Sequence, residues 1–185
     1  MYNPIINVRE VNDEMVVLDI EGKLEVLSIP SLFNINEANL TFEMASHSAR
    51  FARVATLCAM AERYQSFCKQ LMEIEYAEAD YKIREEHKES GTKFTEPSIK
   101  GEVTTDDLYI EKVKSYDDAS FTTSLLKRLL DAMKVKADML ISIGAQLRSE
   151  MNMTGMNIRE YESDTKLNEM KEDLKTYHKN KVQQV

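Results

Sequence analysis

The sequence predicts a mainly all-α protein: a long antiparallel helical hairpin with a small N-terminal β-hairpin, assembled as an oligomer. Three observations predict this fold. Only 5 Gly and 3 Pro interrupt the 185 residues, and such a composition favours long helices. Apolar residues recur at steps of three and four over two long stretches, which is helical spacing. A short N-terminal stretch alternates in steps of two instead, as a β-strand does.

The alternating stretch predicts a β-hairpin over residues 15–29, within an N-terminal extension assigned to residues 1–39. Val16 and Leu18 share one face of its first strand, and Gly22 with Lys23 supplies the turn. A two-stranded hairpin is only marginally stable in water. We therefore expect it to pack on another surface or on a neighbouring subunit.

The first helical arm is predicted from Thr41 to Glu89. The side-chain oxygen of Asn39 or Thr41 can cap its start. Gly91 is expected to end it, because Gly readily adopts the left-handed conformation of a helix C-cap. The apolar seam for a partner helix consists of Leu57, Met60, Tyr64, Phe67, Leu71 and Ile74.

A short helix and a second long arm follow. Thr95 as a cap and Pro97 in the first turn predict a short helix to about Gly101. Thr104 is expected to cap the second arm. Two helices of similar length joined by a short turn form an antiparallel hairpin, with arms roughly 70 Å long. The seam of the second arm consists of Tyr116, Ala119, Thr123, Leu126, Leu130, Met133, Ala137, Leu140, Gly144, Leu147 and Met151.

Some apolar residues lie off the two seams. They are Phe51, Val54, Leu129 and Ile141. A monomer is expected to expose these side chains, so the sequence predicts self-association. The helical hairpin is assigned to residues 40–152, and residues 153–185 are expected to form a polar C-terminal helix or tail.

The sequence lacks the patterns of catalytic, metal and cofactor sites. It has no Gly-rich phosphate loop, no paired-Cys metal spacing and no His–Glu helix motif, so we expect no enzyme, metal or cofactor. His47, His87 and His178 stand among polar residues and are expected at the surface. Cys58 and Cys68 are expected to be buried thiols in a reducing compartment. No apolar run approaches the roughly 20 residues that cross a bilayer, so no membrane association is expected.

Charge is distributed unevenly along the chain. The formal net charge is −8, yet the segment 127–148 carries five cations against Asp131 and Asp138. Such a segment forms either a solvated helix face or a surface for an acidic partner. The five cations are Lys127, Arg128, Lys134, Lys136 and Arg148.

Short sequence elements of the two arms and of the hinge between them occur in a characteristic order. They are Leu40–Ala45, Lys69–Glu75, Lys82–Arg84, Thr95–Lys100, Leu130–Lys134 and Leu147–Glu150. In this order they resemble the UvsY-type recombination mediators of bacterial viruses. The resemblance covers residues 40–152 and implies a non-enzymatic accessory protein of DNA recombination, repair and replication.

Further expectations follow from this resemblance. Such mediators form rings, here expected to hold roughly six to eight subunits. They bind single-stranded DNA and help load a RecA-like recombinase onto DNA covered by single-strand-binding protein. The implied location is the cytoplasm of an infected bacterial host. In the family a Lys-x-Arg element contacts DNA, which corresponds to Lys82 and Arg84. The chain departs from the pattern here, because Glu85 and Glu86 follow this element.

The candidate DNA-binding residues are Lys82, Arg84, Lys88, Lys93, Lys134 and Lys136. Tyr81 could stack bases or pack on the first-arm seam, and Tyr109 could also stack bases. We expect Lys134 and Lys136 on a surface that neighbouring subunits share, facing DNA or an acidic segment such as residues 10–25. A solvated helix face with intrahelical partners, such as Asp80 for Arg84, is the alternative for these charges. A structural coiled-coil scaffold or adaptor without DNA binding is the alternative for the function.

Overall fold

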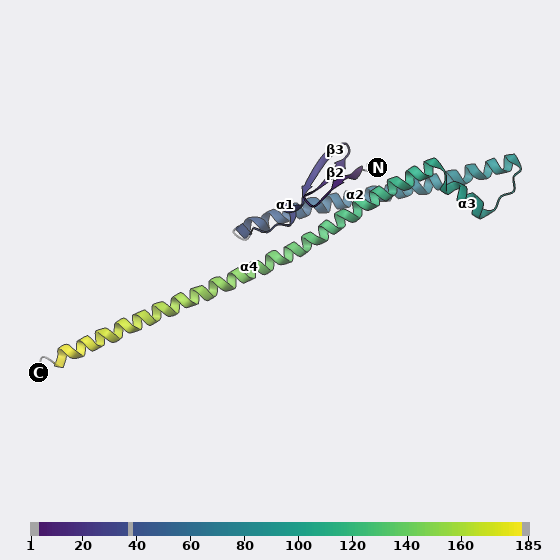
Figure 1. Ribbon diagram of the computed structural model, residues 1–185. Helices are drawn as coiled ribbons and strands as arrows, with labels where there is room; N and C mark the ends of the chain where they lie inside the picture. Colours follow the sequence, from purple (N-terminus) through teal and green to yellow (C-terminus); the bar gives the residue numbers. More distant parts are fainter. Residues whose placement is uncertain (1–3, 37–38, 183–185) are drawn as a thin grey trace. The chain divides into compact units, whose positions relative to one another are not determined.

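A computed structural model describes the backbone of residues 4–36 and 39–182 and the side chains of residues 4–36 and 39–154. The chain is mostly helical and begins with a small sheet (Figure 1). Residues 1–138 form one compact unit, and residues 139–185 form a second. The elements are β1 (Ile6–Val11), β2 (Met15–Ile20), β3 (Lys23–Ser28), α1 (Ile29–Phe33), α2 (Leu40–Ser90), α3 (Glu96–Thr104) and α4 (Asp107–Val182).

The N-terminal sheet has three antiparallel strands in the order β1-β2-β3. The predicted hairpin is confirmed as β2 and β3, with its turn one residue earlier than predicted. Glu21 and Gly22 both have positive φ in its two-residue turn, and Asp19 Oδ1 accepts a hydrogen bond from the Gly22 N–H at 2.8 Å. Strand β1 has no counterpart among the predicted elements. A β-bulge between Val8 and Glu10 interrupts its pairing with β2.

One face of the sheet packs on the helices and forms the main core. Val54 and Leu129, which were expected at the surface of a monomer, are buried in this core. That expectation is wrong for these two residues, because the sheet lies over them. Phe51 is partly buried against the same core, whereas Ile141 is exposed. The core consists of Ile6, Val16, Leu18, Leu27, Leu32, Val54, Leu57, Cys58, Ala61, Leu126, Leu129 and Met133.

A side chain of α4 holds the first strand. Thr122 is buried, and its Oγ1 accepts a hydrogen bond from the Val8 N–H at 3.2 Å. The same hydroxyl donates to the Asp118 carbonyl at 2.9 Å. Thr122 therefore satisfies a backbone donor of β1, close to the bulge where the pairing with β2 is interrupted.

Thr122→Val is expected to lower the free energy of unfolding by about 1–3 kcal/mol, because it keeps the side-chain shape but leaves the Val8 N–H without its acceptor. Urea unfolding followed by circular dichroism measures this loss. Thr56→Val is the matched control, since the exposed Thr56 hydroxyl donates only to the Ala52 carbonyl of its own helix. An equal loss in the two variants would contradict the role of Thr122.

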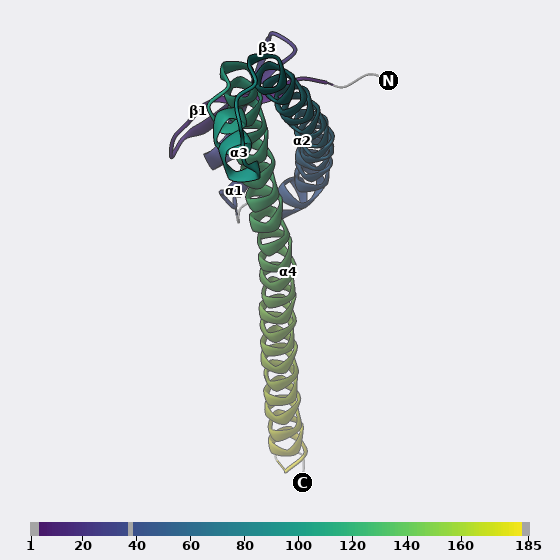
Figure 2. The same cartoon turned by 90° about the vertical axis from the view of Figure 1, so that its right-hand side faces the viewer.

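Within residues 1–138, α2 and the first part of α4 run antiparallel, as predicted (Figures 1 and 2). Tyr76 lies against Tyr109 near the end of α2, with ring centroids 5.5 Å apart. Near its start, Glu43 contacts Lys136 at 3.1 Å. The start of α4 therefore lies beside the C-terminal part of α2, and a later part of α4 lies beside the N-terminal part of α2. This arrangement defines a helical hairpin within residues 1–138.

The ends of α2 form as predicted. Asn39 Oδ1 accepts a hydrogen bond from the Phe42 N–H at 3.4 Å at the start of the helix. Gly91 ends the helix with φ at 64°, and its N–H donates to the carbonyls of His87 and Lys88. Because φ is positive there, a side chain at this position would strain the backbone.

The starts of α3 and α4 differ in one respect from the prediction. Thr95 caps α3 as expected, and its side chain accepts a hydrogen bond from the Ser98 N–H. Thr104 does not cap the second arm, because α3 continues through it. Asp106 takes that place, with its Oδ1 accepting from the Tyr109 N–H at 2.9 Å. Helix α4 then continues to Val182.

Cys58 and Cys68 are buried free thiols, as expected. Burial raises the pKa of both thiols, so both stay protonated near neutral pH. In the part of the chain that is described, no helix is long and apolar enough to cross a membrane.

Candidate functional site

The candidate site is the hinge end, defined as residues 76–112, where α2 ends, α3 packs back on it and α4 begins. A small apolar cluster holds α3 on α2. Its buried members are Ala79 of α2 with Ile99 and Val103 of α3. His87 adds a polar tie, because its Nε2 lies 2.9 Å from a carboxylate oxygen of Glu102. Helix α3 is therefore fixed to α2 by both apolar and polar contacts.

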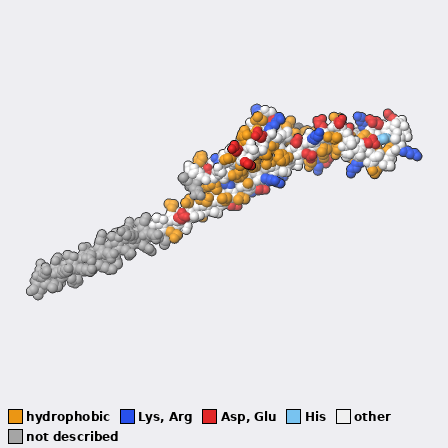
Figure 3. Space-filling model, in the orientation of Figure 1, with side chains coloured by type: hydrophobic (Ala, Val, Ile, Leu, Met, Phe, Trp, Pro, Cys, Tyr) orange, Lys and Arg blue, Asp and Glu red, His pale blue; other side chains and the backbone are white. Residues whose placement is uncertain are grey.

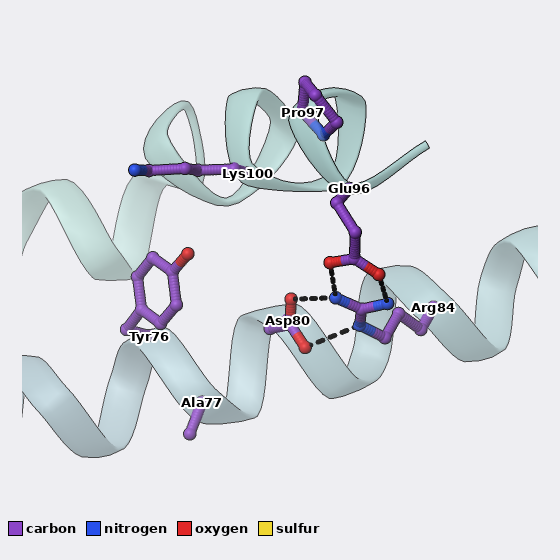
Figure 4. Close-up of a pocket in the computed structure, with 7 residues that line it drawn as sticks. All are labelled: Tyr76, Ala77, Asp80, Arg84, Glu96, Pro97 and Lys100. Carbon is purple, nitrogen blue, oxygen red and sulfur yellow. Dashed lines mark hydrogen bonds and ion pairs between the residues drawn. The ribbon is translucent and has the colours of Figure 1, made fainter. Parts of the chain in front are cut away.

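Arg84 of α2 lies between two carboxylates (Figure 4). Its guanidinium donates to Asp80 on the same helix at 2.7 and 3.1 Å, and to Glu96 of α3 at 2.8 and 2.6 Å. Glu96, and then Asp80, raise the pKa of Arg84 by hydrogen bonding to its charged form. The same contact with Arg84 lowers the pKa of Glu96. The predicted intrahelical partner Asp80 is thus confirmed, and Glu96 is a second partner that the sequence did not reveal.

A hollow of about 650 Å³ opens beside this pair. Figure 4 shows Arg84 and Glu96 at one end of it, and Tyr76 and Lys100 at the other. Its lining residues are Tyr76, Ala77, Asp80, Arg84, Glu96, Pro97 and Lys100.

The other candidate residues of the hinge end are solvent exposed. Lys82 and Lys93 form no ion pair with any residue of the described ranges. Lys88 contacts Glu85 at 2.7 Å, and this carboxylate, with a smaller contribution from Tyr81, raises the pKa of Lys88. The Tyr81 side chain is 67% exposed, so it does not pack into the first-arm seam.

The hinge end is acidic despite these cations. Residues 76–112 contain ten acidic and six basic side chains. Figure 3 shows both kinds interspersed over the region where α2 and α3 meet. A phosphate approaching this surface therefore meets cations whose charge is partly neutralised by neighbouring carboxylates.

Lys136 does not lie on a surface, which corrects the prediction for this residue. It is only 3% exposed. Its Nζ donates to the carbonyls of Leu32 and Asn34 at 3.0 and 2.9 Å and to Glu43 at 3.1 Å. Lys136 thus connects α4 to the end of α1 and the start of α2, where neither DNA nor a neighbouring subunit reaches it.

Two of the four remaining cations of the basic segment, Lys127 and Lys134, form ion pairs within the chain. Lys134 is exposed and contacts Asp131 at 2.8 Å on its own helix. Lys127 contacts Glu62 of α2 at 2.8 Å. The basic segment therefore offers less free positive charge than its sequence indicates.

One histidine also departs from the prediction. His47 is buried rather than exposed, and its Nδ1 has no hydrogen-bond partner within the described part of the chain. Desolvation, then the nearby charges of Lys136 and Arg50, lower the pKa of His47. His87 is half-buried against Phe94 and Glu102. His178 lies outside the described side chains.

No family model, curated protein or solved structure matches this chain. The resemblance of residues 40–152 to UvsY-type mediators therefore stays a prediction. Within residues 4–36 and 39–154, no cluster of at least three His, Cys, Asp or Glu side chains is arranged to hold a metal ion.

Proposed function

We propose that this chain is a recombination mediator without catalytic activity. In this proposal it binds single-stranded DNA as a ring-like homo-oligomer and helps load a RecA-like recombinase onto DNA covered by single-strand-binding protein. Support comes from the ordered resemblance of the two arms, together with the side chains exposed at the hinge end.

The main structural support for DNA binding is an exposed aromatic ring that lies beside cations on α2. Tyr81 is exposed on α2 next to Lys82, and Lys88, seven residues further along, lies on the same side of the helix as Tyr81. An exposed aromatic ring can stack on a base, and adjacent ammonium groups can contact the flanking phosphates. Lys93 extends the positive charge into the turn before α3.

Assembly would compensate for the small number of cations in one subunit. The net charge of −8 opposes binding by a single chain. In an oligomer the hinge ends act together, and linked weak contacts raise the overall affinity by roughly 10²–10⁴. Single-stranded DNA is thus expected to bind tightly only to the assembled protein.

The double variant Lys82→Ala, Lys93→Ala is expected to weaken binding of single-stranded DNA. The plot of log affinity against log salt concentration has a negative slope. Its magnitude should decrease by about 0.7 for each phosphate that the variant no longer neutralises. Fluorescence anisotropy with a labelled oligothymidine at several salt concentrations measures both quantities. Arg84 is left intact, because Asp80 and Glu96 already neutralise its charge in the free protein.

Lys23→Ala is the control for this experiment. Lys23 is an exposed lysine at the β2–β3 turn, far in sequence from the hinge end, and its replacement changes the net charge without touching the candidate site. Equal binding by the double variant and the wild type would exclude Lys82 and Lys93 from the DNA interface.

A structural scaffold or adaptor is the second candidate function. The ion pairs that neutralise Arg84, Lys88 and Lys134 favour it, as do apolar side chains exposed on α4 such as Phe121 and Val135. Absence of DNA binding at low salt, combined with a solution mass well above 21.3 kDa, would support this second function. A 21.3 kDa species at micromolar concentration would contradict both functions, since each requires self-association.

A further inference from the structure

We infer, on the basis of the proposed function, that the hollow between α2 and α3 is a phosphodiester site that the Glu96 carboxylate occupies in the free protein. On binding, a phosphate of single-stranded DNA takes the place of Glu96 on Arg84. Lys100, at the other end of the hollow, is the second cation of the site.

The geometry of the Arg84–Glu96 contact fits this exchange. Two nitrogens of the guanidinium each donate to a different oxygen of Glu96, at 2.8 and 2.6 Å. A phosphate accepts the same paired hydrogen bonds, because two of its oxygens match the fork of the guanidinium. Glu96 therefore holds Arg84 in the arrangement that a phosphate requires.

Exposure shows which of the two carboxylates is replaced. The Glu96 side chain is 77% exposed, whereas that of Asp80 is 28% exposed. An exposed carboxylate that leaves its partner is rehydrated at once, so its departure costs little. Asp80 stays on Arg84 and keeps the guanidinium oriented toward the hollow.

Helix α3 stays docked when the Glu96 side chain leaves. The buried contacts of Ile99 and Val103 with Ala79 do not involve Glu96. The contact between His87 and Glu102 is also independent of it. The exchange therefore needs only a side-chain rotation.

Lys100 supplies a charge that is not already neutralised. It is exposed one turn along α3 from Glu96, and within the described ranges it forms no ion pair. Tyr76 lines the hollow beside it and can donate a hydroxyl hydrogen bond. When Glu96 rotates away, the hollow thus changes from a balanced site to a positively charged one.

Glu96→Gln tests the inference in the oligomeric full-length protein. The affinity for labelled oligothymidine should rise by about fivefold, since an exposed ion pair no longer competes with the phosphate. The salt slope should steepen by about 0.7 for each additional phosphate that is bound. Adding Arg84→Ala to this variant should abolish the gain.

Glu89→Gln is the matched control. It removes the same charge from an exposed position at the end of α2, where within the described ranges Glu89 forms no ion pair. If the Glu89 and Glu96 variants bind DNA equally, the exchange is overturned and only net charge matters. Thermal unfolding verifies that α3 remains docked in both proteins.

A second variant keeps the test decisive if Glu96→Gln is poorly folded. Lys100→Ala leaves the Arg84–Glu96 pair intact. It should lower the affinity for oligothymidine and make this affinity less dependent on salt concentration. Unchanged binding by Lys100→Ala would overturn the phosphate site. If the wild type binds DNA but neither variant changes binding, this inference alone fails. If no protein, Glu96→Gln included, binds DNA at low salt, the proposed function fails with it.

Discussion

Lys136→Met is expected to lower the free energy of unfolding by about 3 kcal/mol. Removing one member of a buried ion pair typically costs about 3–5 kcal/mol, because the other charge stays buried without a partner. Here Lys136 also satisfies the carbonyls of Leu32 and Asn34. The effect should lie at the low end of that range, since Arg50 remains 3.8 Å from Glu43.

Lys134→Met is the control for this prediction. Lys134 is two residues away on the same helix but exposed, and its contact with Asp131 is of the kind that contributes about 0.3–0.5 kcal/mol. Urea unfolding measures the free energy of unfolding of both variants. The two values can be compared directly if the dependence of this free energy on urea concentration is the same in both. Similar stabilities for both would mean that Lys136 reaches solvent and that the buried contact is not formed.

Leu126→Ala is expected to lower the free energy of unfolding by about 2–5 kcal/mol. Leu126 is fully buried in the core that joins the sheet to α2 and α4. Truncation removes its apolar contacts and leaves a cavity between elements that cannot close around it. The destabilisation should therefore affect sheet and helices together, in one cooperative transition.

Leu108→Ala provides the comparison, because Leu108 lies at the start of the same helix and is exposed. Its replacement should change stability by no more than about 0.5 kcal/mol. Separate unfolding of the sheet and the helices in Leu126→Ala, seen as two transitions by near- and far-ultraviolet circular dichroism, would contradict a shared core.

The helices were predictable because their signals are local. Asn39 caps the start of α2 and Gly91 caps its end, each through hydrogen bonds with residues a few positions away. Both residues are recognisable in the sequence as helix caps. Strand β1 lacks such a signal. Ile6 and Val8 alternate with polar residues, but this short pattern is broken at the bulge, and its pairing depends on β2.

The roles of the charged residues were much less predictable. Lys136 looked like part of a basic surface, yet Met133, Lys136 and Leu140 follow helical steps of three and four and are all buried. That spacing was the one signal in the sequence that could have indicated the burial of Lys136. Its partners at Leu32, Asn34 and Glu43 lie about a hundred residues away in sequence, so no local pattern reveals them. Glu96 likewise meets Arg84 only because α3 folds back on α2.

The hydrogen bond between Val8 and Thr122 spans 114 residues, and this separation has a consequence during synthesis. A ribosome adds about 5–20 residues per second, so Thr122 is joined to the chain about 6–23 s after Val8. Until then the apolar face of the sheet has no α4 to cover it. The sheet is therefore made first, yet its core is completed only when this part of α4 has been made.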